Sequence, residues 1–185
     1  MYTTHISKQG DYEMPGDLFE RTETDSKYTE LNTRYNNLYR FVMQYDDYIY
    51  SSRTYGGDEP LTMIDAHTLS YIDDNPGVTP SELIKFWDKT KGAISQILSR
   101  LELMGLIEKK KEDGNQKTIH LYVTETGRKM SLAHKEYDIQ DIAKTLSQLT
   151  QKCSMEEIST FYKVICAYNE VIKNDFELNA ERREK

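Results

Sequence analysis

The sequence predicts a mainly α-helical fold with one two-stranded antiparallel hairpin. Three long segments space their apolar residues alternately by three and four positions, which is the pattern of helices that pack on other helices. Beyond the middle of the chain, Ile119, Leu121 and Val123 instead occupy every second position, after an Asp113-Gly114-Asn115 turn signal. Such alternation after a turn is typical of a β-hairpin.

The chain opens with polar and charged residues that show no periodicity, so residues 1–26 are expected to form a flexible arm. A helix is predicted over residues 27–52, and a Gly-Gly pair followed by a proline ends it within residues 51–60. The apolar seam of this helix consists of Tyr28, Leu31, Tyr35, Leu38, Val42, Tyr45 and Ile49. The seam indicates that the helix packs against other helices.

Three shorter helices are predicted between residues 61 and 105. The first begins near residue 61 or 62 and ends at an Asn-Pro-Gly sequence. The second begins after Thr79, because Thr-Pro-Ser-Glu is a capping box with proline at the first helical position. Its Phe86 and Trp87 are expected inside the domain. The third begins after Thr90 and ends at Gly105, since glycine readily adopts the positive φ found at helix C-termini.

After the hairpin, two long helices are predicted. One begins after Thr124 and runs to about residue 150, and the other covers about residues 155–176. The last residues, 178–185, are mostly charged and are expected to be frayed. The long helices therefore flank a short-element region of residues 61–123.

That region reads helix, helix, helix, strand, turn, strand, which is the element order of a winged helix-turn-helix. The last of its helices turns an apolar face inward and presents small polar and basic side chains on the opposite face. A helix of this kind fits the major groove of B-DNA, where glutamine pairs with adenine and arginine with guanine. The lysines of the hairpin suit phosphates or the neighbouring minor groove. The sequence therefore predicts that residues 61–123 bind double-stranded DNA.

The expected DNA-binding side chains fall into a helix set and a hairpin, or wing, set. The helix set is Thr90, Lys91, Gly92, Ser95, Gln96, Ser99 and Arg100. The wing set is Lys109, Lys110, Asn115, Gln116 and Lys117.

The sequences RLELMGLIEKK, at the end of the expected recognition helix, and VTETG, after the wing, resemble those of the MarR family of bacterial transcription regulators. The resemblance covers roughly residues 28–175. It implies a homodimer in which residues 27–52 and 124–177 form the dimerisation helices. It also implies a regulator, with repression favoured, that a small-molecule effector releases or modulates. One departure lies in the wing, where Asn115-Gln116-Lys117 replaces the family's aspartate and arginine separated by one residue.

The formal net charge of −7 does not conflict with DNA binding. Residues 61–130 hold ten basic and ten acidic residues, so the whole excess of negative charge lies in the flanks. DNA affinity depends on the local field at the binding face rather than on the total charge.

Several other classes of protein are not expected. No run approaches the roughly 18 apolar residues of a membrane span, and the N-terminus lacks a signal core, so a cytoplasmic location is predicted. The sequence contains no phosphate loop, nucleophile elbow or carboxylate–histidine grouping suggestive of catalysis. We therefore expect neither an enzyme nor a bound cofactor.

Histidines and cysteines are the residue types that could make the protein a metal or thiol sensor. His67, His120 and His134 form no His-x3-His pair, so no metal site is predicted. Cys153 and Cys166 lack a basic cluster that would lower their pKa, and they are expected to be buried or incidental thiols. Two alternatives remain: a winged helix that binds a protein partner without specific DNA binding, and a DNA-binding sensor that responds to a metal or a thiol.

Overall fold

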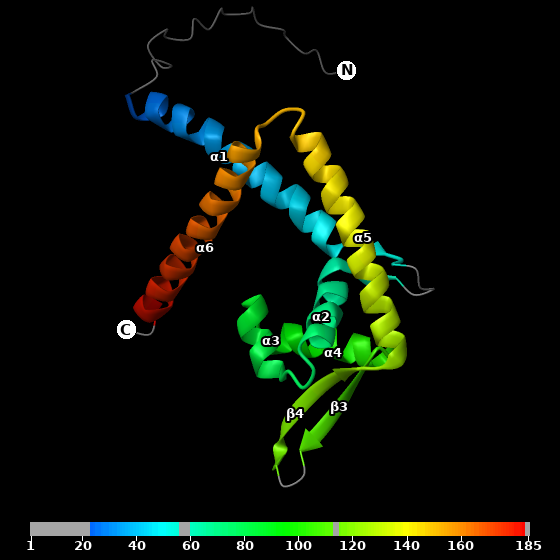
Figure 1. Ribbon diagram of the computed structural model, residues 1–185. Coiled ribbons are helices and arrows are strands. Elements are labelled where there is room, and N and C mark those ends of the chain that lie inside the picture. The colour runs from blue at the N-terminus through cyan, green and yellow to red at the C-terminus, as the bar shows by residue number, and fades with distance from the viewer. Residues whose placement is uncertain (1–22, 56–59, 113–114, 184–185) are drawn as a thin grey trace, which may run out of the picture. The chain divides into compact units, whose positions relative to one another are not determined.

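The computed structural model describes the backbone of residues 23–55, 60–112 and 115–183, and the side chains of these residues except 24, 34, 112, 115–117 and 175–183. The expected N-terminal arm therefore lies outside the described residues up to position 22. The elements are α1 (Glu23–Tyr50), β1 (Ser52–Arg53), β2 (Leu61–Thr62), α2 (Met63–Asp74), α3 (Pro80–Trp87), α4 (Lys91–Leu103), β3 (Ile107–Glu112), β4 (Asn115–Val123), α5 (Glu125–Leu149) and α6 (Met155–Arg183). Figure 1 shows these elements, and they confirm a mainly α fold with a two-stranded wing.

The chain divides into two units, residues 1–49 and residues 50–185. The described part of the first unit is α1. This helix exposes much of its predicted seam, including Tyr28, Leu31, Tyr35, Val42 and Tyr45. The apolar stripe predicted from the sequence is therefore present and lies at the surface of the single chain.

The core of the second unit is built by the winged helix-turn-helix. Apolar side chains from α2, α3, α4 and the hairpin meet there, and α2 also packs against α5. The fully or nearly fully buried members include Leu61, Ala66, Leu69, Ile72, Leu83, Ile94, Leu101 and Leu121. Phe86 was expected in this core, but it lies on the surface, where its ring packs on Tyr71 with the ring centroids 4.0 Å apart. Trp87 is partly buried against the core.

Local capping fixes the starts of the three short helices. Thr79 and Glu82 form the predicted capping box of α3, and the Thr90 hydroxyl accepts a hydrogen bond from the Ala93 N–H at 3.2 Å. Helix α2 begins one or two residues later than expected. Thr62 caps it in extended conformation and pairs with Ser52 in a short β1–β2 ladder, so it cannot also be helical.

The start of α5 is fixed to the turn between α4 and β3. The Thr124 hydroxyl caps α5 through the Gly127 N–H at 3.0 Å and donates to the Gly105 carbonyl at 2.7 Å. A Cβ atom on Gly127 would lie 1.9 Å from the Leu106 carbonyl oxygen. Only glycine permits this approach of the two backbones, which explains part of the VTETG sequence.

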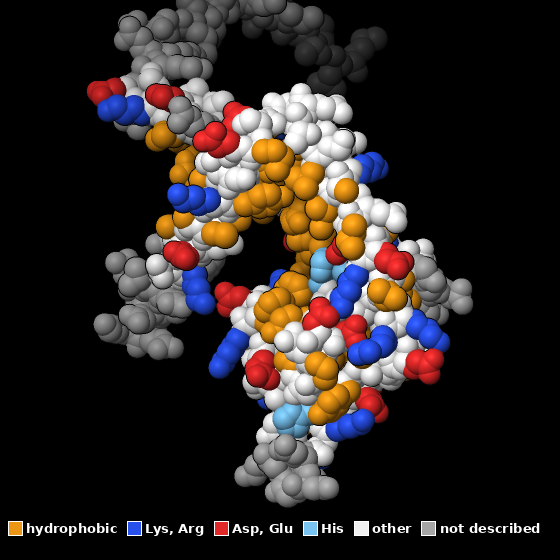
Figure 2. All heavy atoms as spheres, in the orientation of Figure 1, with side chains coloured by type: hydrophobic (Ala, Val, Ile, Leu, Met, Phe, Trp, Pro, Cys, Tyr) orange, Lys and Arg blue, Asp and Glu red, His pale blue; other side chains and the backbone are white. Residues whose placement is uncertain are grey.

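The two C-terminal helices are longer and more exposed than the rest of the second unit. Helix α6 continues to Arg183, past its expected end near residue 176. Apolar side chains remain at the surface of the long helices, as Figure 2 shows for one face of the molecule. On α5 and α6 they include Leu132, Ile139, Ile142, Phe161, Val164, Tyr168 and Ile172. Within the described ranges, none of the helices is long and apolar enough to cross a membrane.

Candidate nucleic-acid interface

Helix α4 presents two chemically different faces. Ile94, Ile97, Leu98 and Leu101 are buried in the core, and this face orients the helix. The opposite face is exposed and holds Lys91, Gly92, Ser95, Gln96, Ser99 and Arg100, with Thr90 at the cap. The structure therefore gathers the predicted helix set on one solvent-facing surface, which we call the α4 face.

Arg100 differs from the rest of the α4 face because it is engaged by a buried carboxylate. Its Nη2 lies 2.6 Å from Asp65 Oδ1 and its Nε lies 3.3 Å from Asp65 Oδ2. The Asp65 side chain is 4% exposed, and the Thr62 hydroxyl also donates to it at 2.7 Å. A fork-like pair of this kind holds α4 against the start of α2. Sequence spacing alone gave no sign of this contact.

Lys109 and Lys110, the members of the predicted wing set whose side chains the structure describes, are each paired with a glutamate. Lys109 Nζ contacts Glu102 of α4 at 2.6 Å, and Lys110 Nζ contacts Glu108 at 2.6 Å. The hydrogen bond that the Lys110 ammonium donates to Glu108 raises the pKa of Lys110, and the ammonium also lies 5.0 Å from the centre of the Tyr122 ring. The charge of this part of the wing is therefore locally balanced.

The strands place these lysines on opposite faces of the hairpin. Lys109 pairs with Leu121, which is buried in the core, and Lys110 pairs with His120 on the other face. The ladder is irregular between Lys111 and Glu112. The side chains of Asn115, Gln116 and Lys117 lie outside the described residues, as do residues 113–114 of the predicted turn. The groove contacts proposed for the wing tip thus stay predictions.

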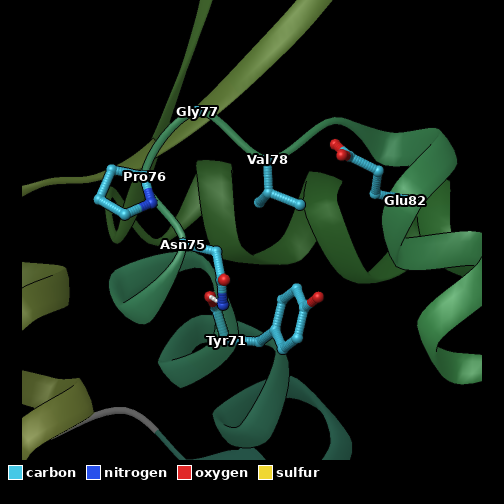
Figure 3. A pocket seen from close by; sticks show the side chains of 6 residues that line it. All are labelled: Tyr71, Asn75, Pro76, Gly77, Val78 and Glu82. Atoms are coloured by element: carbon cyan, nitrogen blue, oxygen red, sulfur yellow. Dashed lines mark hydrogen bonds between the residues drawn. The ribbon is translucent and has the colours of Figure 1, made fainter.

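A hollow of about 310 Å³ lies beside the loop that joins α2 to α3. Figure 3 shows its lining, which is Tyr71, Asn75, Pro76, Gly77, Val78 and Glu82. The Glu82 carboxylate accepts hydrogen bonds from the Thr79 N–H and hydroxyl, both at 2.8 Å, and these bonds lower the pKa of Glu82. Because Glu82 and Asn75 both serve helix ends, the polar groups of the hollow already have structural roles.

Comparison with known proteins gives the relatives of this fold. Residues 60–117 match the model of the MarR family. A Bacillus subtilis (strain 168) protein, the uncharacterized HTH-type transcriptional regulator YhjH, is 28% identical over 83 residues, which are 45% of this chain and 47% of that protein. The matched segment thus spans about half the length of this curated relative.

Solved structures share the fold over more of the chain. Streptococcus pneumoniae FabT, in a crystal structure with DNA, aligns with a TM-score of 0.55 and 22% identity over 80% of this chain and 98% of FabT. Lactococcus lactis ZitR, also solved with DNA, aligns with a TM-score of 0.58 and 17% identity over 77% of this chain and 97% of ZitR. Residues 60–117 are thus similar to the MarR family, and the chain shares the fold of these two structures.

Proposed function

We propose that this protein is a homodimeric, sequence-specific DNA-binding regulator of transcription, with α4 as its recognition helix. The observation that carries the proposal is the α4 face, where polar and basic side chains are exposed on a helix whose other face is locked in the core. The MarR family match covers this element, and the FabT and ZitR structures are described as complexes with DNA.

Within the α4 face, the side chains divide by role. Ser95, Gln96 and Ser99 are exposed on successive turns and suit contacts with base edges. Lys91 and Gly92 lie in the first helical turn, where a basic side chain and open backbone N–H groups suit a phosphate. Arg100 orients α4 through Asp65 and is assigned to positioning rather than to base recognition.

The homodimer is proposed from the long helices. Apolar side chains on α1, α5 and α6 remain exposed in the single chain, and large exposed apolar surfaces in soluble proteins serve as interfaces. A two-fold dimer places two α4 faces on a pseudo-palindromic site, one helical turn or a multiple of it apart. We further propose that the protein acts as a repressor and that an effector releases it from DNA by changing this spacing.

A winged helix that binds a protein partner without specific DNA binding is the main rival. Its support is the local charge balance of Lys109 and Lys110 together with the acidic total charge. The exposed Cys153 and Cys166 leave a thiol response as a second rival. Indifference of DNA binding to peroxide would remove that rival.

Selection of bound duplexes from a random DNA pool, followed by binding titrations of the selected site, tests the proposal. We expect a palindromic site and an affinity that falls steeply between about 50 and 200 mM salt, as phosphate contacts require. The matched control is a scrambled duplex of the same composition. Equal affinity for both duplexes, or a flat dependence on salt, would favour the protein-partner rival.

A further inference from the structure

Two histidines and an aspartate from different helices come together between α2 and α5. They are His67 on α2 and His134 and Asp138 on α5, and one ligand atom from each lies within 4.8 Å of the other two. Asp138 Oδ2 is 3.5 Å from His67 Nε2 and 3.3 Å from His134 Nε2. We call this group the His-His-Asp cluster.

The spacing of the cluster fits a tetrahedral ion. Zinc bonds of about 2.0–2.1 Å at tetrahedral angles separate neighbouring ligand atoms by about 3.3 Å. The two measured contacts to Asp138 Oδ2 already have this separation. All three ligand atoms lie within 4.8 Å of one another, so closing the cluster around an ion needs only side-chain movements.

A buried hydrogen-bond chain fixes the orientation of the His134 ring. His134 Nδ1 lies 3.1 Å from the Ser70 hydroxyl, which lies 3.3 Å from the Ser131 hydroxyl. Ser131 in turn donates to Asp73 Oδ2 at 3.0 Å. The Ser131 hydroxyl has one hydrogen and two acceptors within reach, Ser70 Oγ and the nearer, charged Asp73 carboxylate. With that hydrogen on Asp73, Ser70 can donate to Ser131 and accept a hydrogen bond from Nδ1. This assignment leaves Nε2 with its lone pair directed at the cluster.

The Nε2 atom of His134 is otherwise unsatisfied. The residue is 1% exposed, and among the described residues Nε2 has no hydrogen-bond partner, although Asp138 Oδ2 is 3.3 Å away. A buried polar atom left in this state costs about 1–3 kcal/mol. In metal sites, the second ring nitrogen of a ligating histidine usually donates to a partner, as Nδ1 does here.

We propose that the His-His-Asp cluster binds one zinc ion, with water at the fourth position. Imidazole and carboxylate ligands without thiolate suit zinc, whereas calcium and magnesium require more oxygen ligands. The His67 and Asp138 side chains are 39% and 26% exposed, so an ion and its water have access from solvent. Because the ligands come from α2 and α5, the ion clamps the winged helix to the long helix that leaves it. We also propose that zinc is the effector that changes the DNA affinity, and this part rests on the proposed function.

Cobalt(II) titration of the full-length protein, stripped of metal by a chelator, tests the site directly. Four-coordinate cobalt gives visible absorption bands, and zinc should displace it. We expect one cobalt per chain in the wild type, and binding weakened at least tenfold in His67→Gln and in Asp138→Asn. His120→Gln is the matched control, since His120 Nδ1 donates to the Gly77 carbonyl at 2.8 Å on the wing, outside the cluster. Circular dichroism of each variant shows whether its fold is retained.

Two results would overturn the site. One is the absence of cobalt binding by a folded wild type, and the other is equal binding by the wild type, His67→Gln and Asp138→Asn. Such equality would mean that the cluster is an ordinary contact between neutral histidine and carboxylate.

The regulatory consequence has its own readout. With the selected duplex, zinc should change the DNA affinity of the wild type and leave that of His67→Gln unaltered; an equal response in both would overturn the effector role. The cobalt titration uses no DNA, so a failure of the proposed DNA binding leaves the test of the site intact.

Discussion

Replacement of Arg100 by alanine should lower the free energy of unfolding of the protein, rather than its recognition of particular DNA bases. The substitution removes the two guanidinium N–H groups that contact Asp65, at 2.6 and 3.3 Å, from a carboxylate that is 4% exposed. The Thr62 hydroxyl still donates to that carboxylate. Removal of one partner from a buried ion pair costs about 3–5 kcal/mol. Since the Arg100 side chain is 49% exposed and water can replace part of it, we expect the lower end, about 3 kcal/mol.

Urea unfolding followed by circular dichroism measures this loss. For a chain of this size, about 3 kcal/mol corresponds to a fall in Tm of roughly 6–12 °C. Ser99→Ala is the matched control, because Ser99 is the neighbouring exposed residue on α4. Asp65→Asn and the double variant complete a cycle, whose coupling energy should reach about 1.5–3 kcal/mol.

The reasoning fails if Arg100→Ala is as stable as Ser99→Ala, or if the coupling between the two sites is near zero. The DNA measurement gives a second test. If Arg100 only orients α4, its loss should weaken binding to the selected and scrambled duplexes by the same factor. A loss confined to the selected duplex would instead show that Arg100 reads a base.

Three further predictions concern the α4 face, the start of α5 and the cap of α3. Gln96→Ala should weaken binding to the selected duplex by about 1–3 kcal/mol in fluorescence anisotropy, with unchanged Tm; an equal loss on scrambled DNA would make Gln96 a backbone contact. Gly127→Ala should lower the free energy of unfolding by at least about 1–3 kcal/mol, because its Cβ would meet the Leu106 carbonyl oxygen at 1.9 Å, and an unaltered melting curve would contradict this. Glu82 has a lowered pKa in the folded state, so its stabilisation of α3 is present above its ordinary pKa of 4.5 and is lost as pH falls through the lowered value. Acid unfolding of the wild type should therefore show a stability loss that Glu82→Gln lacks, and parallel curves for the two proteins would refute it.

The features of the fold that depend on residues close together in the sequence could be predicted from the sequence. Thr79 and Thr90 cap helices because their hydroxyls reach N–H groups three residues later. Gly105 ends its helix with a φ of 66°, as glycine does at such positions. These capping effects act within a single helical turn, so the sequence of that turn is sufficient to predict them.

The contacts that define the candidate sites depend on residues far apart in the chain. Arg100 and Asp65 are separated by 35 positions, and the sequence of α4 alone does not indicate that Arg100 contacts Asp65. The His-His-Asp cluster was missed for a related reason. A search for His-x3-His passes over His134 and Asp138, which share a helix face at the same spacing, and His67 joins them only through the packing of α2 on α5. Phe86 was wrongly expected in the core because its spacing does not reveal which face of a short helix is left uncovered.

Because Thr124 joins the wing directly to α5, a displacement of the far end of this long helix is linked to the angle of the helix at the wing. Strand β4 ends at Val123 and α5 begins at Glu125, so a single residue, bound to the Gly105 carbonyl, forms the whole connection. A 25-residue helix is about 37 Å long at 1.5 Å per residue. A tilt of about 5° moves the far end of a rigid helix of this length by about 3 Å, and a displacement of that end by about 3 Å tilts its start by the same angle. Small displacements where α5 ends are thus coupled to the angle at which the wing and the end of α4 are held.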